Sequence, residues 1–376
     1  MPDIAMCNSS LCPKNTQCYR FMAIANPEYQ TYNDFEAIRC HENFKWFWDI
    51  EGRKIREIEL SDRYIFVDDF DKVLQFDRNG KFIRQVGSNG KGPNEYLKVS
   101  TFTVSNEKQQ IYIKPHYTSR LIIFDFDGNV ITSIDDYFER YCSKLFFIEP
   151  DIVVYTNYEK FFPNFGSEPE KVILVAKRFD GEILLEVPFD FNQEKKPGMG
   201  TTINLPAYKS NDKLFFKKVF NDTIYTLNKT YDGIEMHALA KGRNIDINNI
   251  KSADHFFKEF CENYRVNNFF DTGNYFFINA VMENKEPVKL FIWDKQKGDY
   301  YTLEDSADKI GLKNDIDNFY WFYPKKVQLN YLIGWVESYQ LVEYINEPGN
   351  KEFKLPTALE NLNSGDNPII VMAPIK

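Results

Sequence analysis

The sequence predicts an all-β fold, a six-bladed β-propeller of four-stranded antiparallel blades with a few short helical insertions. Three observations predict this fold: a β-hairpin pattern that recurs about every 50 residues, apolar runs of strand length ahead of each hairpin, and a high aromatic content. Phe, Tyr and Trp make up 16% of the 376 residues, and aromatic side chains favour strands.

The hairpin pattern is an apolar run, an Asn-Gly or Asp-Gly pair, and a second alternating run. It is clearest at 72–86 ("KVLQFDRNGKFIRQV"), 120–134 ("RLIIFDFDGNVITSI") and 171–187 ("KVILVAKRFDGEILLEV"), with weaker copies at 223–239 and 289–303. Asn-Gly and Asp-Gly supply the positive φ angles of a tight hairpin turn. Each copy therefore predicts the outer two strands of a blade.

Paired apolar segments ahead of the hairpins predict the inner two strands of each blade. They are 55–61 and 63–69, 100–105 and 109–115, 144–150 and 151–158, 212–219 and 222–228, 267–273 and 275–283, and 321–329 and 331–338. Six such units of about 55 residues occupy the chain from about residue 43 to its end, within the usual range of blade number.

The glycine-rich stretch 87–96, "GSNGKGPNEY", has two interpretations. A phosphate-binding P-loop needs Gly-Lys-Ser/Thr at the start of a helix. Here Gly92-Pro93 leads through Glu95-Tyr96 into "LKVSTFTVS", which is a strand pattern. The sequence therefore predicts a corner between the outer strand of one blade and the inner strand of the next.

This motif, Gly-x-x-Gly-x-Gly-Pro-x-Glu-Tyr, resembles a pattern of uncharacterised, NHL-like six-bladed β-propeller proteins that are abundant in gut Bacteroidetes. The segments 215–227 ("FFKKVFNDTIYTL") and 367–376 ("NPIIVMAPIK") resemble other signatures of that family. The resemblance covers roughly residues 50–376. It implies the propeller fold and, because the family usually carries an export or lipoprotein signal, a location in the cell envelope.

The predicted organisation is a cysteine-rich segment, 1–42, followed by the propeller, 43–376. Four of the six cysteines lie in the first segment: Cys7, Cys12, Cys18 and Cys40. Four thiolates can bind zinc tetrahedrally and stabilise a segment without its own core. Disulfides are the competing interpretation for an exported protein, and free thiols are the third.

Composition excludes some partners and leaves others open. A net charge of −9 argues against a nucleic-acid binder, and no run reaches the ~18 apolar residues of a transmembrane helix. The first 25 residues lack a secretory h-region. As written the chain is therefore expected in the cytoplasm, or in the cell envelope if the N-terminus is incomplete. The oligomeric state is left open.

Ring closure and helices are predicted from the remaining segments. The alternating run 44–50 ("FKWFWDI") and the terminal run 368–375 are expected to complete one blade together, because an unpaired edge invites aggregation. Apolar residues at helical spacing predict helices at 249–266, 338–346 and 356–363.

Candidate ligand-binding residues come from two places. His116, Tyr117 and Arg120 fall in a predicted turn beside Lys114, and Tyr320, Trp321 and Tyr323 fall in the aromatic run 317–326. Exposed aromatic patches tend to mark interaction sites. Asp68, Asp69 and Asp71 could ligate calcium, but they lack EF-hand spacing and favour a turn.

These patterns leave three functional hypotheses. The favoured one is a non-catalytic propeller that binds a peptide, glycan or protein at its channel mouth. The alternative is a propeller enzyme, a lactonase or a glycan-processing hydrolase or lyase, with channel carboxylates and calcium. Three or more convergent carboxylates would favour the enzyme. In the third, the cysteine-rich segment recruits a partner and the propeller displays it. No Gly-x-Ser-x-Gly motif supports a hydrolase nucleophile.

Overall fold

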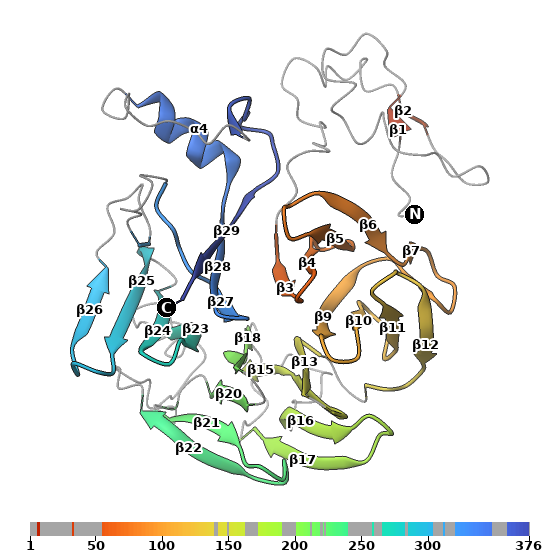
Figure 1. Cartoon of the computed structure of the whole chain (residues 1–376). Helices are drawn as coiled ribbons and strands as arrows, with labels where there is room; N and C mark the ends of the chain where they lie inside the picture. The colour runs from red at the N-terminus through yellow and green to blue at the C-terminus, as the bar shows by residue number, and fades with distance from the viewer. Residues whose placement is uncertain are drawn as a thin grey trace.

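The structure, a computed structural model, is a β-propeller of six blades arranged around a common centre (Figure 1). It describes residues 55–138, 142–148, 150–161, 172–189, 201–210, 213–218, 221, 223–239, 258, 265–282, 285–303, 311–312, 320–347 and 359–375, and two short strands nearer the N-terminus. Those two, β1 (Met6–Cys7) and β2 (Tyr32–Asn33), pair in parallel.

Blades 1 to 3 are four-stranded antiparallel sheets whose strands follow one another outward from the centre. Blade 1 contains β3 (Glu57–Leu60), β4 (Tyr64–Asp68), β5 (Val73–Asp77) and β6 (Phe82–Val86). Blade 2 contains β9 (Val99–Ser105), β10 (Gln110–Pro115), β11 (Leu121–Asp125) and β12 (Val130–Ile134). Blade 3 contains β13 (Lys144–Ile148), β14 (Ile152–Thr156), β16 (Val172–Arg178) and β17 (Ile183–Pro188).

Blades 4 to 6 continue the ring. Blade 4 contains β19 (Ala207–Ser210), β20 (Lys213–Lys217), β21 (Thr223–Leu227) and β22 (Ile234–Leu239). Blade 5 contains β23 (Arg265–Asp271), β24 (Tyr275–Met282), β25 (Lys285–Asp294) and β26 (Tyr300–Leu303). Blade 6 has three strands among the described residues: β27 (Lys326–Gln328), β28 (Tyr331–Val336) and β29 (Ile369–Pro374).

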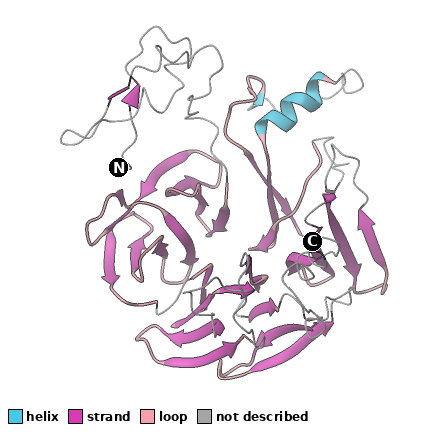
Figure 2. Ribbon diagram, turned by 180° about the vertical axis from the view of Figure 1, so that it is seen from behind, coloured by secondary structure: helices cyan, strands magenta, loops and turns pink. Residues whose placement is uncertain are grey.

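In the described parts of the connections lie four short strands and a helix. β7 (Ser88–Asn89) pairs in parallel with β8 (Glu95–Tyr96), and β15 (Tyr158–Phe161) pairs antiparallel with β18 (Thr201–Asn204). Helix α4 (Ser338–Asn346) confirms the helix predicted at 338–346, and it lies at the edge of the ring (Figure 2).

The prediction for blade 4 needs one correction. Residues 212–219 were expected as its inner strand, but β20 is its second strand, and the inner strand is β19. The four residues of β19 were missed because "AYKS" is short and half polar. The predicted closing strand at 44–50 lies outside the described residues. Of the predicted helix at 249–266, only Lys258, which is helical, and residues 265–266, which belong to β23, are described. β29 pairs with β28.

The recurring corner has the predicted turn chemistry. In blade 1, the N–H of Gly80 donates to the Asp77 carbonyl at 3.1 Å, and Gly80 has a φ of +83°. Blade 2 repeats this with Gly128 and Asp125, at 3.0 Å and a φ of +82°. Glycine adopts this left-handed conformation without strain. The predicted corner at 87–96 is also confirmed, because it connects β6 with β9.

The hydrophobic core is divided among the interfaces between neighbouring blades. Phe66 of blade 1 packs in one cluster with Phe102 of blade 2. Between blades 2 and 3, Tyr112 stacks on Phe147 with ring centroids 4.5 Å apart. Each blade buries one face against each neighbour, so the repeated strands need the closed ring to bury both faces.

The ring closes between blades 6 and 1. Ile333 of β28 packs against Ile58 of β3. The side chain of Gln328 accepts from the Leu60 N–H at 2.9 Å and donates to the Leu60 carbonyl at 3.1 Å and to Glu59 Oε2 at 2.8 Å. These bonds satisfy backbone groups on the inner edge of β3, where no further strand pairs among the described residues.

We expect Gln328→Ala to lower the free energy of unfolding by about 2–3 kcal/mol, because it leaves the Leu60 N–H and carbonyl without partners. Urea denaturation measures the change. Gln296→Ala is the matched control, since Gln296 is exposed and bonds to the exposed side chain of Asn274. Equal stability of the two variants would contradict this account of closure.

Candidate functional site

The longest connections between strands all lie at one rim of the ring, and the connections at the other rim are short. Antiparallel order places the connections into each inner strand, and those between the second and third strands, at the same rim. The longer connections that begin and end there span 87–98, 135–143, 157–171, 189–206, 240–264, 304–325 and 337–368. We call this the long-connection rim. At the opposite rim the connections have only a few residues each, such as 61–63 and 106–109.

Charged side chains of three inner strands converge at the centre of the ring near the long-connection rim. Glu57 and Lys144 are the first residues of β3 and β13, and Lys326 is the first residue of β27. Glu59 lies two residues further along β3 and therefore on the same face as Glu57. We call Glu57, Glu59, Lys144 and Lys326 the inner-strand cluster.

Contacts within the cluster join blades that are far apart in the sequence. Lys326 Nζ lies 2.7 Å from Glu59 Oε1 and donates to the Ile58 carbonyl at 2.8 Å. Lys144 Nζ donates to the Ala207 carbonyl of blade 4 at 3.2 Å.

Electrostatics in the cluster follow from enclosure by the ring. Burial raises the pKa of Glu57, although the positive charges of Lys326 and Lys144 oppose the shift. Burial lowers the pKa of Lys144, against the attraction of Glu57. These directions agree with the position of the three residues at the start of inner strands β3, β13 and β27. Shifts of this kind are frequent at functional sites.

The arrangement can hold a ligand that carries both hydrogen-bond donors and acceptors. It offers two carboxylates and two ammonium groups, and one carboxylate is already paired with Lys326. The three convergent carboxylates that would have favoured an enzyme are not found among the described residues. No group of three His, Cys, Asp or Glu side chains there could hold a metal ion.

Sequence reasoning missed all four members of the inner-strand cluster. A signal was present for Glu57, Glu59 and Lys144, because the other residues of "EIEL" and "KLFFI" are apolar. The strand of Lys326, "KVQ", gives no such signal. The partners come from blades 1, 3 and 6, and that proximity cannot be inferred from spacing along the chain.

The first group of predicted ligand residues, His116, Tyr117 and Arg120, occupies different environments in the structure. Tyr117 is 88% exposed, and its ring lies 3.9 Å from the half-buried His116 ring. Burial lowers the pKa of His116, and the charges of Lys114 and Arg56 lower it further. Arg120 instead holds the chain, because its Nη1 donates to the Gly92 and Pro93 carbonyls at 2.9 and 2.6 Å.

The second group lies mostly in packing. Tyr320 is buried, and its ring lies 5.1 Å from that of Tyr344 on α4. Trp321 is half-buried against the same cluster, and Tyr323 is half-buried against the core of blades 4 and 5. Buried and half-buried rings alternate from Tyr320 to Tyr323 because α4 and the neighbouring blades cover them. Its use in binding stays a prediction.

The acidic run 68–71 forms a turn. Asp68 is buried, pairs with Arg56, and accepts from the Phe70 N–H at 2.8 Å. Burial raises the pKa of Asp68 to about 7, while the Arg56 charge lowers it. Asp69 Oδ1 accepts from the N–H of Asp71 and of Lys72. Turn geometry therefore accounts for these positions.

The predicted zinc residues lie outside what can be described. Cys7 belongs to β1, whose side chains the structure does not describe, and Cys12, Cys18 and Cys40 are outside the described residues. Zinc in this segment remains a prediction.

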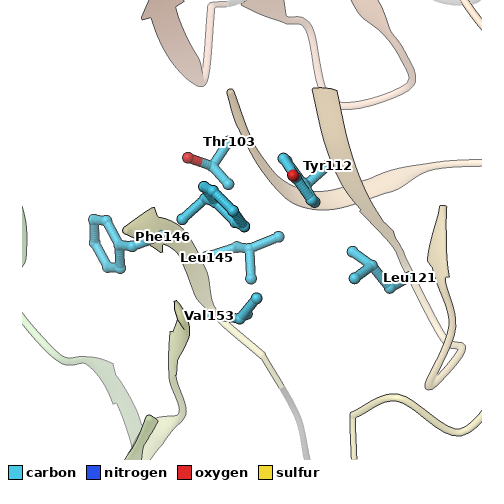
Figure 3. Close-up of a pocket in the computed structure, with 7 residues that line it drawn as sticks. Thr103, Tyr112, Leu121, Leu145, Phe146 and Val153 are labelled. Carbon is cyan, nitrogen blue, oxygen red and sulfur yellow. The ribbon is translucent and has the colours of Figure 1, made fainter. Parts of the chain in front are cut away.

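A small apolar pocket lies between blades 2 and 3 (Figure 3). Its lining consists of Thr103, Tyr112, Leu121, Leu145, Phe146, Phe147 and Val153. It has no room for a water molecule, so it belongs to the packing between blades and is not a ligand site.

The six blades define the class of the protein, a β-propeller. The chain belongs to the family described as "Domain of unknown function (DUF4934)", whose model matches residues 52–374. A comparison with curated proteins found no match.

Two solved structures from Bacteroides match this chain. One, named "Putative exported protein", is from Bacteroides fragilis NCTC 9343 and is 16% identical, with a TM-score of 0.63; the match covers 87% of this chain and 91% of that one. Another, a member of the DUF4221 family from Bacteroides vulgatus, is 15% identical with a TM-score of 0.47, over 69% and 82% of the two chains. At such identity the likeness concerns the fold alone. No described helix is long and apolar enough to cross a membrane.

Arg120→Met should loosen the corner at 87–96 because it removes two hydrogen bonds to that backbone. We expect amide hydrogen exchange of peptides covering 87–98 to accelerate at least tenfold, with about 1–2 kcal/mol of stability lost. Arg178→Met, which removes only exposed ion pairs with Asp151 and Glu182, is the control. Unchanged exchange at the corner would show that Arg120 does not hold it.

Asp68→Asn should change how stability depends on pH. The pKa of Asp68 is about 7 in the folded protein and about 4 when unfolded. The folded state therefore binds the extra proton between these values, and the stability that Asp68 contributes falls as pH rises from 4 to 7. The stability of wild type minus that of the variant should fall by roughly 2–4 kcal/mol over this range. Urea unfolding at pH 4.5 and 7.5 measures it, and a constant difference would be contrary to the raised pKa.

Proposed function

We propose that the protein is a non-catalytic binding propeller that recognises a peptide, glycan or protein ligand at the mouth of its centre. One observation carries this proposal: the inner-strand cluster converges near the rim where the long connections begin and end. Ligand sites are typically concave positions where a few polar groups converge on a rigid scaffold. The blades supply the scaffold and the long connections supply variable contacts.

The contacts that the two lysines of the cluster already make favour binding over catalysis. Lys326 is engaged by Glu59 and by a backbone carbonyl, and Lys144 by another carbonyl. Side chains held in this way can orient a ligand, but their protons are less available for transfer. The family itself is one of unknown function, so the proposal rests on the site and not on the fold.

The enzymatic alternative, a lactonase or glycan-processing type, is favoured by one observation. The pKa of Glu57 is raised and that of Lys144 is lowered at the same centre. Titratable groups whose environments shift their pKa values are a recurring basis for acid and base roles. In that case Glu57 would be the acid or base and Lys144 would stabilise developing negative charge.

Location and metal content are further parts of the proposal. The resemblance to exported propeller proteins and the fold shared with the Bacteroides fragilis protein support a place outside the cytoplasm. Under that proposal the N-terminal cysteines hold zinc or form disulfides, with free thiols as the third alternative. Metal analysis of protein purified without a histidine tag tests for zinc.

The test is a screen of glycan and peptide arrays with the full chain, followed by calorimetry with the strongest ligand. We expect Glu57→Gln and Lys144→Met to weaken binding at least tenfold, because both remove a charge from the centre. Lys213→Met is the matched control, since Lys213 is exposed at the opposite rim. Circular dichroism confirms that each variant is folded.

Two results would count against the proposal: no ligand in either array, or equal weakening by the control. Conversion of the bound ligand, followed by NMR of the ligand and abolished by Glu57→Gln, would replace binding with the enzymatic alternative.

A further inference from the structure

Two aromatic rings are displayed at the long-connection rim by neighbouring blades. Phe70 lies in the connection between β4 and β5, and Tyr117 lies in the equivalent connection between β10 and β11. Their side chains are 47% and 88% exposed. Neither ring belongs to the hydrophobic clusters of blades 1 to 3.

The backbone at both positions is unusual for such residues. Phe70 has a φ of +76° and Tyr117 a φ of +61°. Bulky side chains rarely adopt this region, and each instance costs about 1–3 kcal/mol. Asn or Gly would fit both turns better. The two rings are therefore kept at the tips of their turns against local preference.

A guanidinium lies against one ring and an imidazole against the other. The guanidinium carbon of Arg56 is 5.3 Å from the centroid of the Phe70 ring, and the His116 ring meets the Tyr117 ring edge-on with centroids 3.9 Å apart. These contacts leave much of each ring open to solvent while fixing its orientation.

Backbone hydrogen bonds fix the two turns side by side. The Val99 N–H donates to the Phe70 carbonyl at 3.2 Å, and the His116 N–H donates to the Lys98 carbonyl at 2.8 Å. Phe70 and His116 thus flank the same two residues of chain. Two strand spacings separate them, which is about 10 Å.

Polar groups of both kinds surround the rings. His116 is half-buried, and a neutral imidazole can both donate and accept a hydrogen bond. Lys98 and Asp71 are exposed on either side and offer an ammonium donor and a carboxylate acceptor. We call Arg56, Phe70, Lys98, His116 and Tyr117 the blade 1–2 platform.

A sugar ring matches this combination better than other ligands. Its C–H face packs on an aromatic ring, while its hydroxyls both donate and accept hydrogen bonds. The backbone separation of about 10 Å between Phe70 and His116 leaves room for more than one sugar ring between the two turns. Anionic lipid is disfavoured, because Asp69 and Asp71 share the turn with Phe70 and the net charge is −9.

We propose that the blade 1–2 platform is a glycan-binding subsite in which Phe70 and Tyr117 stack on sugar rings and His116 and Lys98 bind their hydroxyls. This inference rests on the proposed binding function and deepens it, because it names the class of ligand and a second contact region on the same rim.

The test uses the full-length double variant Phe70→Asn/Tyr117→Asn. Asn tolerates positive φ, so we expect stability to stay equal or to rise, while affinity for the strongest oligosaccharide of the array falls at least tenfold. Tyr300→Asn is the control, because Tyr300 is 74% exposed on the outer strand of blade 5. It should bind like wild type in calorimetry.

The outcomes distinguish failure of the platform from failure of the binding function. Glycan binding that survives the double variant overturns the platform and leaves the binding function intact. Binding of peptides but of no glycan also overturns the platform and leaves the binding function intact. A protein that binds nothing in either array overturns both proposals, and loss of affinity confined to the double variant supports the platform.

Discussion

The inner strand of each blade has an edge that faces the centre of the ring, and the hydrogen bonding of that edge constrains the rest of the molecule. Its N–H and carbonyl groups have no partner strand among the described residues, and buried backbone groups left unsatisfied are costly. Long polar side chains from other blades supply partners: Gln328 for Leu60, Lys326 for Ile58, Lys144 for Ala207, and Lys209 for Phe147 at 2.5 Å. The lysines therefore have a structural reason to be at the centre.

This solution places charge where the ring is most enclosed, and enclosed charge must be balanced. Glu59 forms an ion pair with Lys326. Glu57 and Lys144 carry opposite charges, and burial raises the pKa of Glu57 and lowers the pKa of Lys144. Closure of the ring and the candidate site thus depend on the same side chains. At the rim opposite the long-connection rim, the hairpins of successive blades repeat one type of turn. The long-connection rim carries connections of varied length. A rigid repeated body with one variable rim is a common basis for recognition.

The sequence predicted what depends on local chemistry. The hairpin corners, most strands and the helix at 338–346 follow from turn residues and periodicity. Prediction failed at the short strand β19, which is defined by pairing with β20. The burial of Tyr320 under α4 and the contact of Arg120 with a loop from the preceding blade also depend on neighbours in space. The inner-strand cluster unites residues from three blades, and Phe70 was hidden in an acidic turn. No local pattern reports such proximity.

The central claim, that side chains of neighbouring blades satisfy the inner edges, is tested most directly at Leu60. Its N–H has Gln328 as its acceptor and no strand partner. Amide hydrogen exchange in ¹⁵N-leucine-labelled protein compares Leu60 with the buried Leu121 of β11 and with the exposed turn residue Leu329. The account predicts that Leu60 exchanges as slowly as Leu121. Exchange as fast as that of Leu329 would contradict it.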